Sequence, residues 1–141
     1  MVIQRWQSVL LLIAAMCMAL FCFTPFASFN DPVSAESVML ASPSDFIVFL
    51  VLNLTIAALL FISIFLFRNL KRQLTVTLLS ILLMIVSAVT GIIIVYVRFE
   101  GGHIELCGGA LLLILALVAS LWAYRRIAHD RRLLASMDRI R

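Results

Sequence analysis

The sequence predicts an all-α integral membrane protein, a bundle of four transmembrane helices, and three observations lead to this fold class. The chain of 141 residues is 65% hydrophobic and only 13% charged, whereas soluble domains are about 45–50% apolar and about 25% charged. Four long segments contain no charged residue. The basic residues gather in alternate connections between these segments. The composition excludes a disordered chain, and the length fits a single membrane domain, residues 1–141.

The four uncharged segments are about residues 8–29, 46–67, 74–97 and 106–124. A helix needs roughly 20 apolar residues to cross the hydrocarbon core of a bilayer. Apart from a closed barrel, only a helix satisfies its own backbone polar groups in lipid. The segments lack the two-residue alternation of barrel strands, so we expect four transmembrane helices.

The first segment allows two interpretations. Pro25 lies late in it and either kinks the helix or ends it near the outer surface. A cleaved signal peptide is the alternative, with Arg5 in the basic region and Val33-Ser34-Ala35 as the cleavage site. The apolar stretch exceeds the roughly 7–15 residues of a signal peptide, which favours a helix that is retained.

The distribution of charge predicts how the chain is threaded. Lys and Arg prefer short cytoplasmic loops. If all four segments cross the membrane, ten of the eleven basic residues share one side, and Arg98 alone lies opposite with five acidic residues. The ten basic residues are Arg5, Arg68, Lys71, Arg72, Arg125, Arg126, Arg131, Arg132, Arg139 and Arg141. Both termini are therefore predicted to be cytoplasmic, and Trp6, Trp122, Tyr124, Tyr96 and Phe99 fall where aromatic anchors belong.

The two outer loops carry local signals. Ser42, Pro43 and Asp45 offer a cap, a first-turn proline and a first-turn acid for the second helix. Residues 98–105 place two tripeptides around Gly-Gly, which suits a small β-hairpin with Arg98 opposite Glu105. Residues 37–40 could supply a third strand.

A metal site in the outer loop is a weaker hypothesis. Glu100, His103 and Glu105 are permissible ligands, but a solvated, ion-paired loop explains them as well. We predict no metal, no cofactor and no catalytic residue, because no known catalytic motif is present. Cys22 and Cys107 could both approach the outer side, and whether they pair is left open.

The membrane segments carry few polar groups, and none is charged. We expect these side chains to bond between helices or back to their own backbone. They are Asn53, Thr55, Ser63, Ser80, Ser87, Thr90 and Ser120. Small residues also recur at helical spacing and predict close helix contacts, within the bundle or between copies in a homo-oligomer. These are Ala15 with Ala19, Ala116 with Ser120, Ala119 with Ala123, and Ser80, Ser87 and Gly91.

The C-terminal residues 125–141 predict an amphipathic basic helix that continues the fourth span. Its apolar side holds Leu133, Leu134, Met137 and Ile140, and the opposite side holds Arg125, Arg131, Arg132 and Arg139. Together with Arg126 and Arg141, these residues are the predicted contact with the membrane surface or a partner. Three roles compete: contact with anionic inner-leaflet lipids, docking to a protein partner, and nucleic-acid binding. Because the tail lacks stacking aromatics and a nucleic-acid-binding fold, we predict no nucleic-acid partner.

Both ends of the chain resemble a known family. Its members begin Met-Ile-Gln-Arg-x-Gln and end in a basic helix closing with Arg-Ser-x-Asp-Arg-Leu-Arg. Here the start is Met1-Val2-Ile3-Gln4-Arg5-Trp6-Gln7 and the end Ala135-Ser136-Met137-Asp138-Arg139-Ile140-Arg141. The chain thus resembles the four-span inner-membrane family of Bacteroidota called domain of unknown function 4293. The resemblance implies a bacterial inner membrane and no assigned activity.

The sequence therefore favours a non-enzymatic structural or interaction subunit with a basic cytoplasmic tail. A small-molecule carrier or channel subunit is the alternative, with a polar path near Asn53, Ser87 and Thr90. A third hypothesis is a lipid-modifying enzyme whose site is the outer loop around Glu100, His103 and Glu105.

Overall fold

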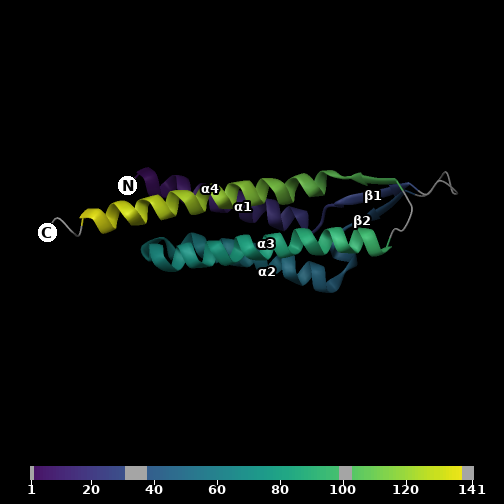
Figure 1. The fold of residues 1–141 in the computed structure, drawn as a ribbon, viewed down its shortest axis with the longest axis horizontal. Helices are drawn as coiled ribbons and strands as arrows, with labels where there is room; N and C mark the ends of the chain where they lie inside the picture. The colour runs from purple at the N-terminus through teal and green to yellow at the C-terminus, as the bar shows by residue number, and fades with distance from the viewer. Residues whose placement is uncertain (1, 31–37, 99–102, 138–141) are drawn as a thin grey trace.

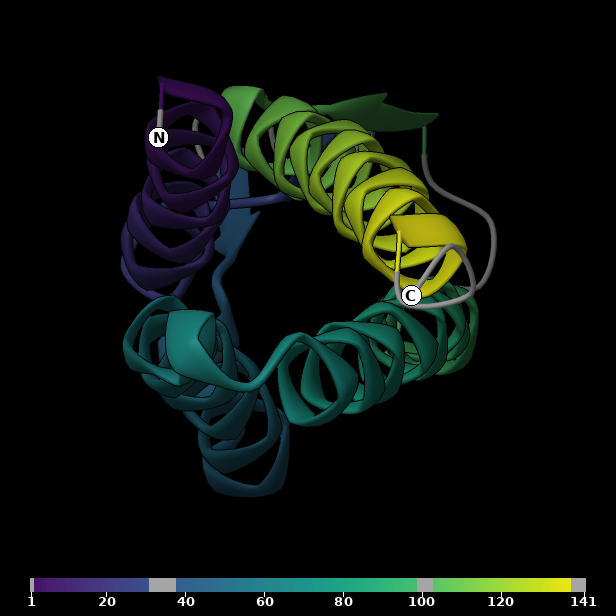
Figure 2. The ribbon, with the colours of Figure 1, turned by 90° about the vertical axis from the view of Figure 1, so that its left-hand side faces the viewer.

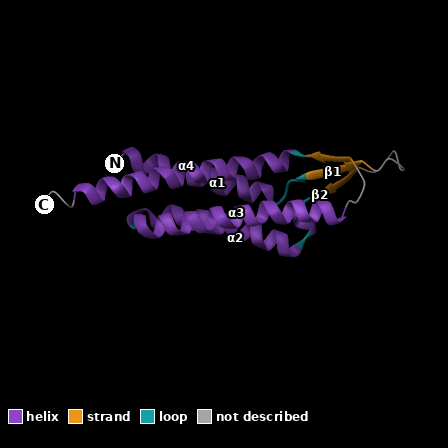
Figure 3. Ribbon diagram, viewed as in Figure 1, coloured by secondary structure: helices purple, strands orange, loops and turns teal. Residues whose placement is uncertain are grey.

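Four antiparallel helices, capped at one end by a small sheet, make up the fold (Figure 1). The computed structural model describes residues 2–30, 38–98 and 103–137. The helices are α1 Val2–Phe21, α2 Ile47–Phe65, α3 Leu70–Arg98 and α4 Gly108–Met137. The strands are β1 Ala27–Asn30, β2 Val38–Ala41 and β3 His103–Leu106. Figure 3 shows all three strands gathered at one end of the bundle.

Seen end-on, the helices form a ring in which each contacts two neighbours (Figure 2). α1 packs against α2 and α4, and α3 packs against the same two helices. In the described part of the chain, three segments are long and apolar enough to cross a membrane, Ile47–Arg68, Leu70–Val97 and Gly108–Leu133. Trp6–Phe21 of α1 is a shorter apolar helix. Four apolar helices are thus confirmed, although the first is shorter than expected.

The first predicted span ran to residue 29, and this boundary is wrong. α1 ends at Phe21, and residues 27–30 form strand β1. Pro25 explains the difference, because proline lacks the N–H of a helical bond and disfavours the helical conformation in the residue before it. Pro25 therefore belongs to the exit from the helix and does not kink it. The proposed cleavage site at residues 33–35 lies outside the described residues.

The sheet has the order β2-β1-β3, with both neighbouring pairs antiparallel. Ala27 lies opposite Ala41 on one side and Leu106 on the other. The expected outer hairpin exists, but β1 and β2 form it, and β2 is the third strand that residues 37–40 suggested. The predicted pairing of Arg98 with Glu105 is wrong, because α3 keeps its helical bonds through Arg98 and β3 pairs with β1. Residues 99–102 lie outside the described part of the chain.

The start of the second helix uses the predicted residues, but in a different element. Pro43–Asp45 form one turn of 3-10 helix, η1, and α2 begins only at Ile47. The Asp45 carboxylate accepts bonds from the Ser42 backbone N–H at 2.9 Å and from the Ser42 hydroxyl at 2.8 Å. Both bonds favour the ionised form and lower the pKa of Asp45. A second 3-10 turn, η2 Leu66–Arg68, leads from α2 to α3.

The segment after α1 ties the sheet to the helices. The Phe26 N–H donates to the Ala41 carbonyl at 2.9 Å, and the Phe26 carbonyl accepts from Cys107 at 3.1 Å. The Pro25 carbonyl accepts from the N–H of Gly109 at 3.1 Å, which satisfies one of the free donors at the start of α4. The side chains of Phe21, Phe26 and Phe49 lie beneath, with ring centroids 5.8–6.3 Å apart. A buried aromatic cluster thus closes the sheet end of the bundle.

Gly109 and Gly108 provide a matched test of this contact. A Cβ on Gly109 would lie 2.8 Å from the Pro25 carbonyl carbon and 3.2 Å from the Phe26 Cα, whereas one on Gly108 would meet nothing within 4 Å. Because the obstacle is backbone, Gly109→Ala should lower the free energy of unfolding by about 1–3 kcal/mol. Unfolding of the full chain in mixed detergent micelles measures this. Gly108→Ala should leave stability nearly unchanged, and equal effects of the two variants would contradict the close approach.

Candidate functional site

One buried stripe of α3 is rich in small and polar residues, although most of the rest of the interior is apolar. Positions 73, 77, 80, 84, 87 and 91 of α3 are all buried and form one stripe. Four of them are polar, namely Gln73, Thr77, Ser80 and Ser87. Large apolar side chains such as Ile92 on α3 and Val48 on α2 are instead mostly exposed. This inverted pattern suits a helix bundle whose surroundings are lipid, since lipid is as apolar as leucine.

Hydrogen bonds between α2 and α3 use this stripe. The Ser87 hydroxyl donates to Asn53 Oδ1 at 2.6 Å, and Asn53 Nδ2 donates to the Phe49 carbonyl at 2.8 Å. The Ser63 and Thr77 hydroxyls lie 2.9 Å apart. Because Thr77 donates to the Gln73 carbonyl, Ser63 is the donor to Thr77. Two buried polar pairs therefore fix the register of α2 against α3.

The remaining polar groups mostly satisfy themselves locally. The hydroxyls of Thr55, Ser80 and Thr90 each donate to a carbonyl one turn earlier in their own helix. The Ser120 hydroxyl donates to the Leu117 carbonyl and lies 3.6 Å from the Met84 sulfur of α3. Both predicted uses of these residues, between helices and back to the backbone, are confirmed.

The predicted carrier path finds little support in this geometry. Asn53 and Ser87 have no exposed surface and bind each other, and Thr90 is bonded to its own helix. Among the residues that the structure describes, Gln73 Oε1 is the one buried side-chain oxygen or nitrogen without a hydrogen-bond partner. The region around Asn53 is therefore packed protein.

The predicted small-residue contacts hold on α4 and only in part on α1. Ala116, Ala119, Ser120 and Ala123 are all buried. On α1, Ala15 is buried but Ala19 is exposed. The buried face of α1 turns instead through Leu11, Ala14 and Met18, because larger side chains fill the space that faces α2 and α4.

The charge asymmetry of the sequence is also an asymmetry in space. Figure 1 shows the start of α1, the α2–α3 connection and the end of α4 at one end of the bundle, and the sheet at the other. Exposed basic residues therefore gather at the first end, where Arg68, Lys71 and Arg72 join the arginines of α4. Glu105 and Asp45 lie at the sheet end.

α4 continues without a break from the apolar span into the basic tail. Its C-terminal end extends past the ends of the other three helices (Figure 1). Arg125, Arg126, Arg131, Arg132 and Leu133 are exposed. The opposite side of the same turns is packed, with Ala123 and Ile127 fully buried. Of the remaining predicted tail residues, Leu134 and Met137 belong to α4, and Arg139, Ile140 and Arg141 lie outside the described residues.

One contact of the tail was not predicted from the sequence. Gln7 Nε2 of α1 donates to Asp130 Oδ2 of α4, two residues that are 123 positions apart. Gln7 is only 2% exposed. Neither residue belongs to a motif, and spacing along one helix cannot reveal a contact between α1 and α4. This bond attaches the beginning of the tail to the bundle.

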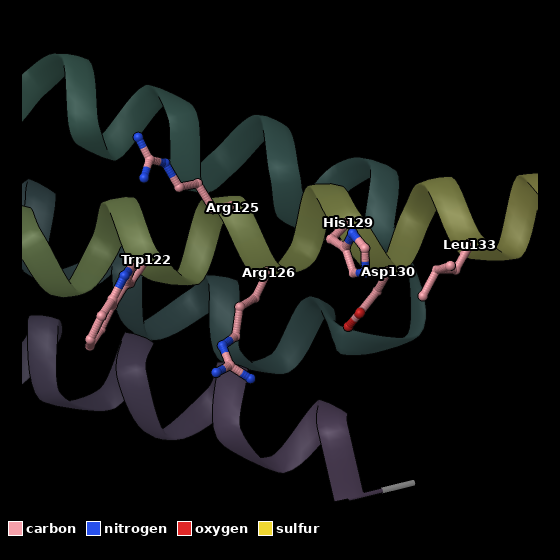
Figure 4. A pocket seen from close by; sticks show the side chains of 6 residues that line it. All are labelled: Trp122, Arg125, Arg126, His129, Asp130 and Leu133. Carbon is pink, nitrogen blue, oxygen red and sulfur yellow. The ribbon is translucent and has the colours of Figure 1, made fainter.

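An open hollow of about 460 Å³ lies along the exposed face of α4 next to this contact (Figure 4). Its lining residues are Trp122, Arg125, Arg126, His129, Asp130 and Leu133. Arg126 reaches toward α1, whereas Arg125 points to the other side of the α4 axis (Figure 4). The hollow therefore has one guanidinium on each flank and an indole at the end nearer the membrane span.

The outer-loop residues do not assemble into a site within the described part of the chain. Glu105 is exposed on β3, His103 begins that strand, and Glu100 lies outside the described residues. No three His, Cys, Asp or Glu side chains among the described residues lie together as metal ligands would. Cys17, Cys22 and Cys107 are free thiols, and Cys22 is buried.

An apolar exterior, buried neutral polar pairs and helices long enough to cross a bilayer define this chain as a multi-pass helical membrane protein. More particularly, it belongs to the family described as Domain of unknown function (DUF4293), whose pattern matches residues 3–140. The resemblance seen at both ends of the sequence is thereby confirmed. No curated protein and no solved structure matches the chain.

Ser87 and Ser80 allow the bond between helices to be tested. Both are buried serines on one stripe of α3, but only Ser87 bonds to another helix. Ser87→Ala removes the donor to Asn53 and should cost about 0.6–1.7 kcal/mol of unfolding free energy. Unfolding in mixed micelles measures the loss. Ser80→Ala should cost clearly less, and a reversed order would contradict the assigned role of the Asn53 pair.

The Gln7–Asp130 bond can be isolated by a double-mutant cycle. Gln7→Ala, Asp130→Ala and the double variant should give a coupling energy of about 1.5 kcal/mol, the lower end for a bond to a charged group because Asp130 is partly exposed. The same cycle between Gln7 and His129, an exposed neighbour of Asp130, serves as control. Coupling there as large as with Asp130 would show that the first cycle reports general disruption of α4.

Proposed function

We propose that this protein is a non-enzymatic structural or interaction subunit of a bacterial inner membrane, with the basic end of α4 as its contact surface. The observation that carries the proposal is the extension of α4 past the other helices, with Arg131, Arg132 and Leu133 exposed on it. The end of α4 that projects past the other helices carries cations and an apolar residue on its surface. Such a segment can contact a membrane surface or a partner protein.

The proposed threading puts both termini in the cytoplasm. The basic residues of α1, of the α2–α3 connection and of α4 share one end of the bundle. Basic residues close to membrane spans favour the cytoplasmic side. The three-stranded sheet then lies on the outer side, in the periplasm of a Gram-negative envelope such as the Bacteroidota possess.

A structural role also accounts for the polar interior better than transport does. Ion-coupled carriers and pumps keep ionisable groups at membrane depth, whereas the buried polar side chains of α2 and α3 are neutral, and two pairs of them bond to each other. Asn53 and Ser87, the centre of the proposed polar path, are used to hold α2 against α3. The bonds thus act as fixed internal contacts of a rigid subunit.

Truncation after Asp130 tests the proposal. The cut removes residues 131–141 but keeps the Gln7–Asp130 bond and the buried Ile127. The truncated protein should insert into the membrane and unfold like the full chain. It should lose most of the proteins that co-purify with the full-length protein from gently solubilised native membranes. Mass spectrometry identifies the co-purifying proteins in both cases.

The matched control neutralises cations elsewhere at the same end. Arg68→Gln/Lys71→Gln/Arg72→Gln changes exposed residues of η2 and of the first turn of α3 and should keep the co-purifying set. An unchanged set after truncation would contradict the proposal. The threading is checked with Ser136→Cys in a background without native cysteines, where an impermeant maleimide should react only after permeabilisation.

A further inference from the structure

We infer that the hollow on α4 is a binding site for the phosphodiester head group of an anionic phospholipid. The hollow is lined by Trp122, Arg125, Arg126, His129, Asp130 and Leu133 and is called the α4 groove below. The inference rests on the proposed function insofar as the basic end of the bundle lies at a membrane surface. It adds a ligand and a defined place for it.

Exposed side chains follow one face of α4 from the apolar span into the basic tail. Leu111, Leu115, Val118 and Trp122 are 50–63% exposed and recur at helical spacing. The same stripe continues into Arg126 and His129, which are also exposed. One face of α4 thus changes from apolar to cationic within a single turn, with an indole at the boundary, as expected where hydrocarbon meets head groups.

The dimensions agree with one leaflet. Half of a hydrocarbon core is roughly 15 Å thick, and ten residues of helix rise by about 15 Å. A lipid whose phosphate lies at Arg126 would therefore lay its acyl chains along α4 to about the level of Leu115. The side chains on that path, Val118 and Leu115, are exposed and apolar, so the groove is continuous with a surface that already faces lipid.

The charges favour an anion. Arg125 and Arg126 flank the groove from opposite sides of the helix axis (Figure 4), and His129 adds a ring that can donate. Asp130 is the one carboxylate in the lining, and it accepts a bond from Gln7. Guanidinium groups bind phosphate oxygens through two parallel N–H donors. A zwitterionic head group would bring its own cation toward these arginines and should bind less well.

Binding can be measured on the purified full-length protein with two probes. Native mass spectrometry would count bound phosphatidylglycerol against phosphatidylcholine with identical acyl chains. Quenching of Trp122 fluorescence by chain-brominated phosphatidylglycerol, in a Trp6→Phe background, would report binding beside the groove. The wild-type protein should prefer the anionic lipid in both measurements.

The decisive variants differ only in position. Arg125→Gln/Arg126→Gln should reduce the preference for phosphatidylglycerol roughly 30-fold, which corresponds to about 1 kcal/mol for each arginine. Arg68→Gln/Arg72→Gln removes the same charge from exposed residues at the same end of the bundle, outside the lining. This control should keep most of the preference.

Three results would overturn the inference. Equal losses in the two double variants would mean that the whole basic end of the bundle attracts anionic lipid and that no groove is involved. The inference would also be wrong if the wild-type protein bound phosphatidylglycerol and phosphatidylcholine equally well. Displacement of the lipid by millimolar inorganic phosphate would identify a site for a soluble anion. The lipid measurements use purified protein without any partner protein. A negative result would therefore not affect the truncation test of the proposed function, and the two proposals can fail separately.

Discussion

The structure depends on hydrogen bonds and close packing between the helices. In lipid, the hydrophobic effect does not drive these helices together. In lipid, a leucine gains little by leaving the bilayer for the protein interior, so helices associate through small residues and buried polar pairs. The Asn53–Ser87 and Ser63–Thr77 pairs hold α2 against α3, and Gln7–Asp130 holds α1 against α4. Ala116, Ala119 and Ala123 keep α4 close to its neighbours. The inward polar stripe of α3 follows from this constraint.

The sheet end solves a different problem, that of closing the bundle where the chain leaves the helices. Pro25 and Phe26 contribute backbone groups to β2, to Cys107 and to the first turn of α4. The phenylalanine cluster beneath fills the space that the end of α1 leaves. This short segment thereby bonds to two distant parts of the chain, β2 and the residues at the start of α4, and Gly109 is required where two backbones meet.

The opposite end is cationic, and it differs from the sheet end in carrying an exposed helix. At the sheet end β1 is hydrogen-bonded to a strand on each side, whereas α4 carries its arginines beyond the other helices. The same helix therefore contributes core residues such as Ile127 and an exposed basic surface. The packing of one side of α4 against α1 sets how α4 is oriented about its own axis. This orientation decides which arginines face outward and line the α4 groove.

The sequence by itself determined the number of helices, the gathering of basic residues at one end, and the continuation of the fourth helix into its tail. These features follow from local composition, because each helix must be apolar along its own length and the charged residues must fall outside it. Pro25 had already offered an end of the first helix as one of two interpretations, because proline limits a helix locally. The tertiary structure alone decided that β1 stands between β2 and β3 and that Asp130 binds Gln7. Local patterns did not predict these two features, because each depends on partners brought close only by folding: the edge of another strand, or an amide 123 residues away.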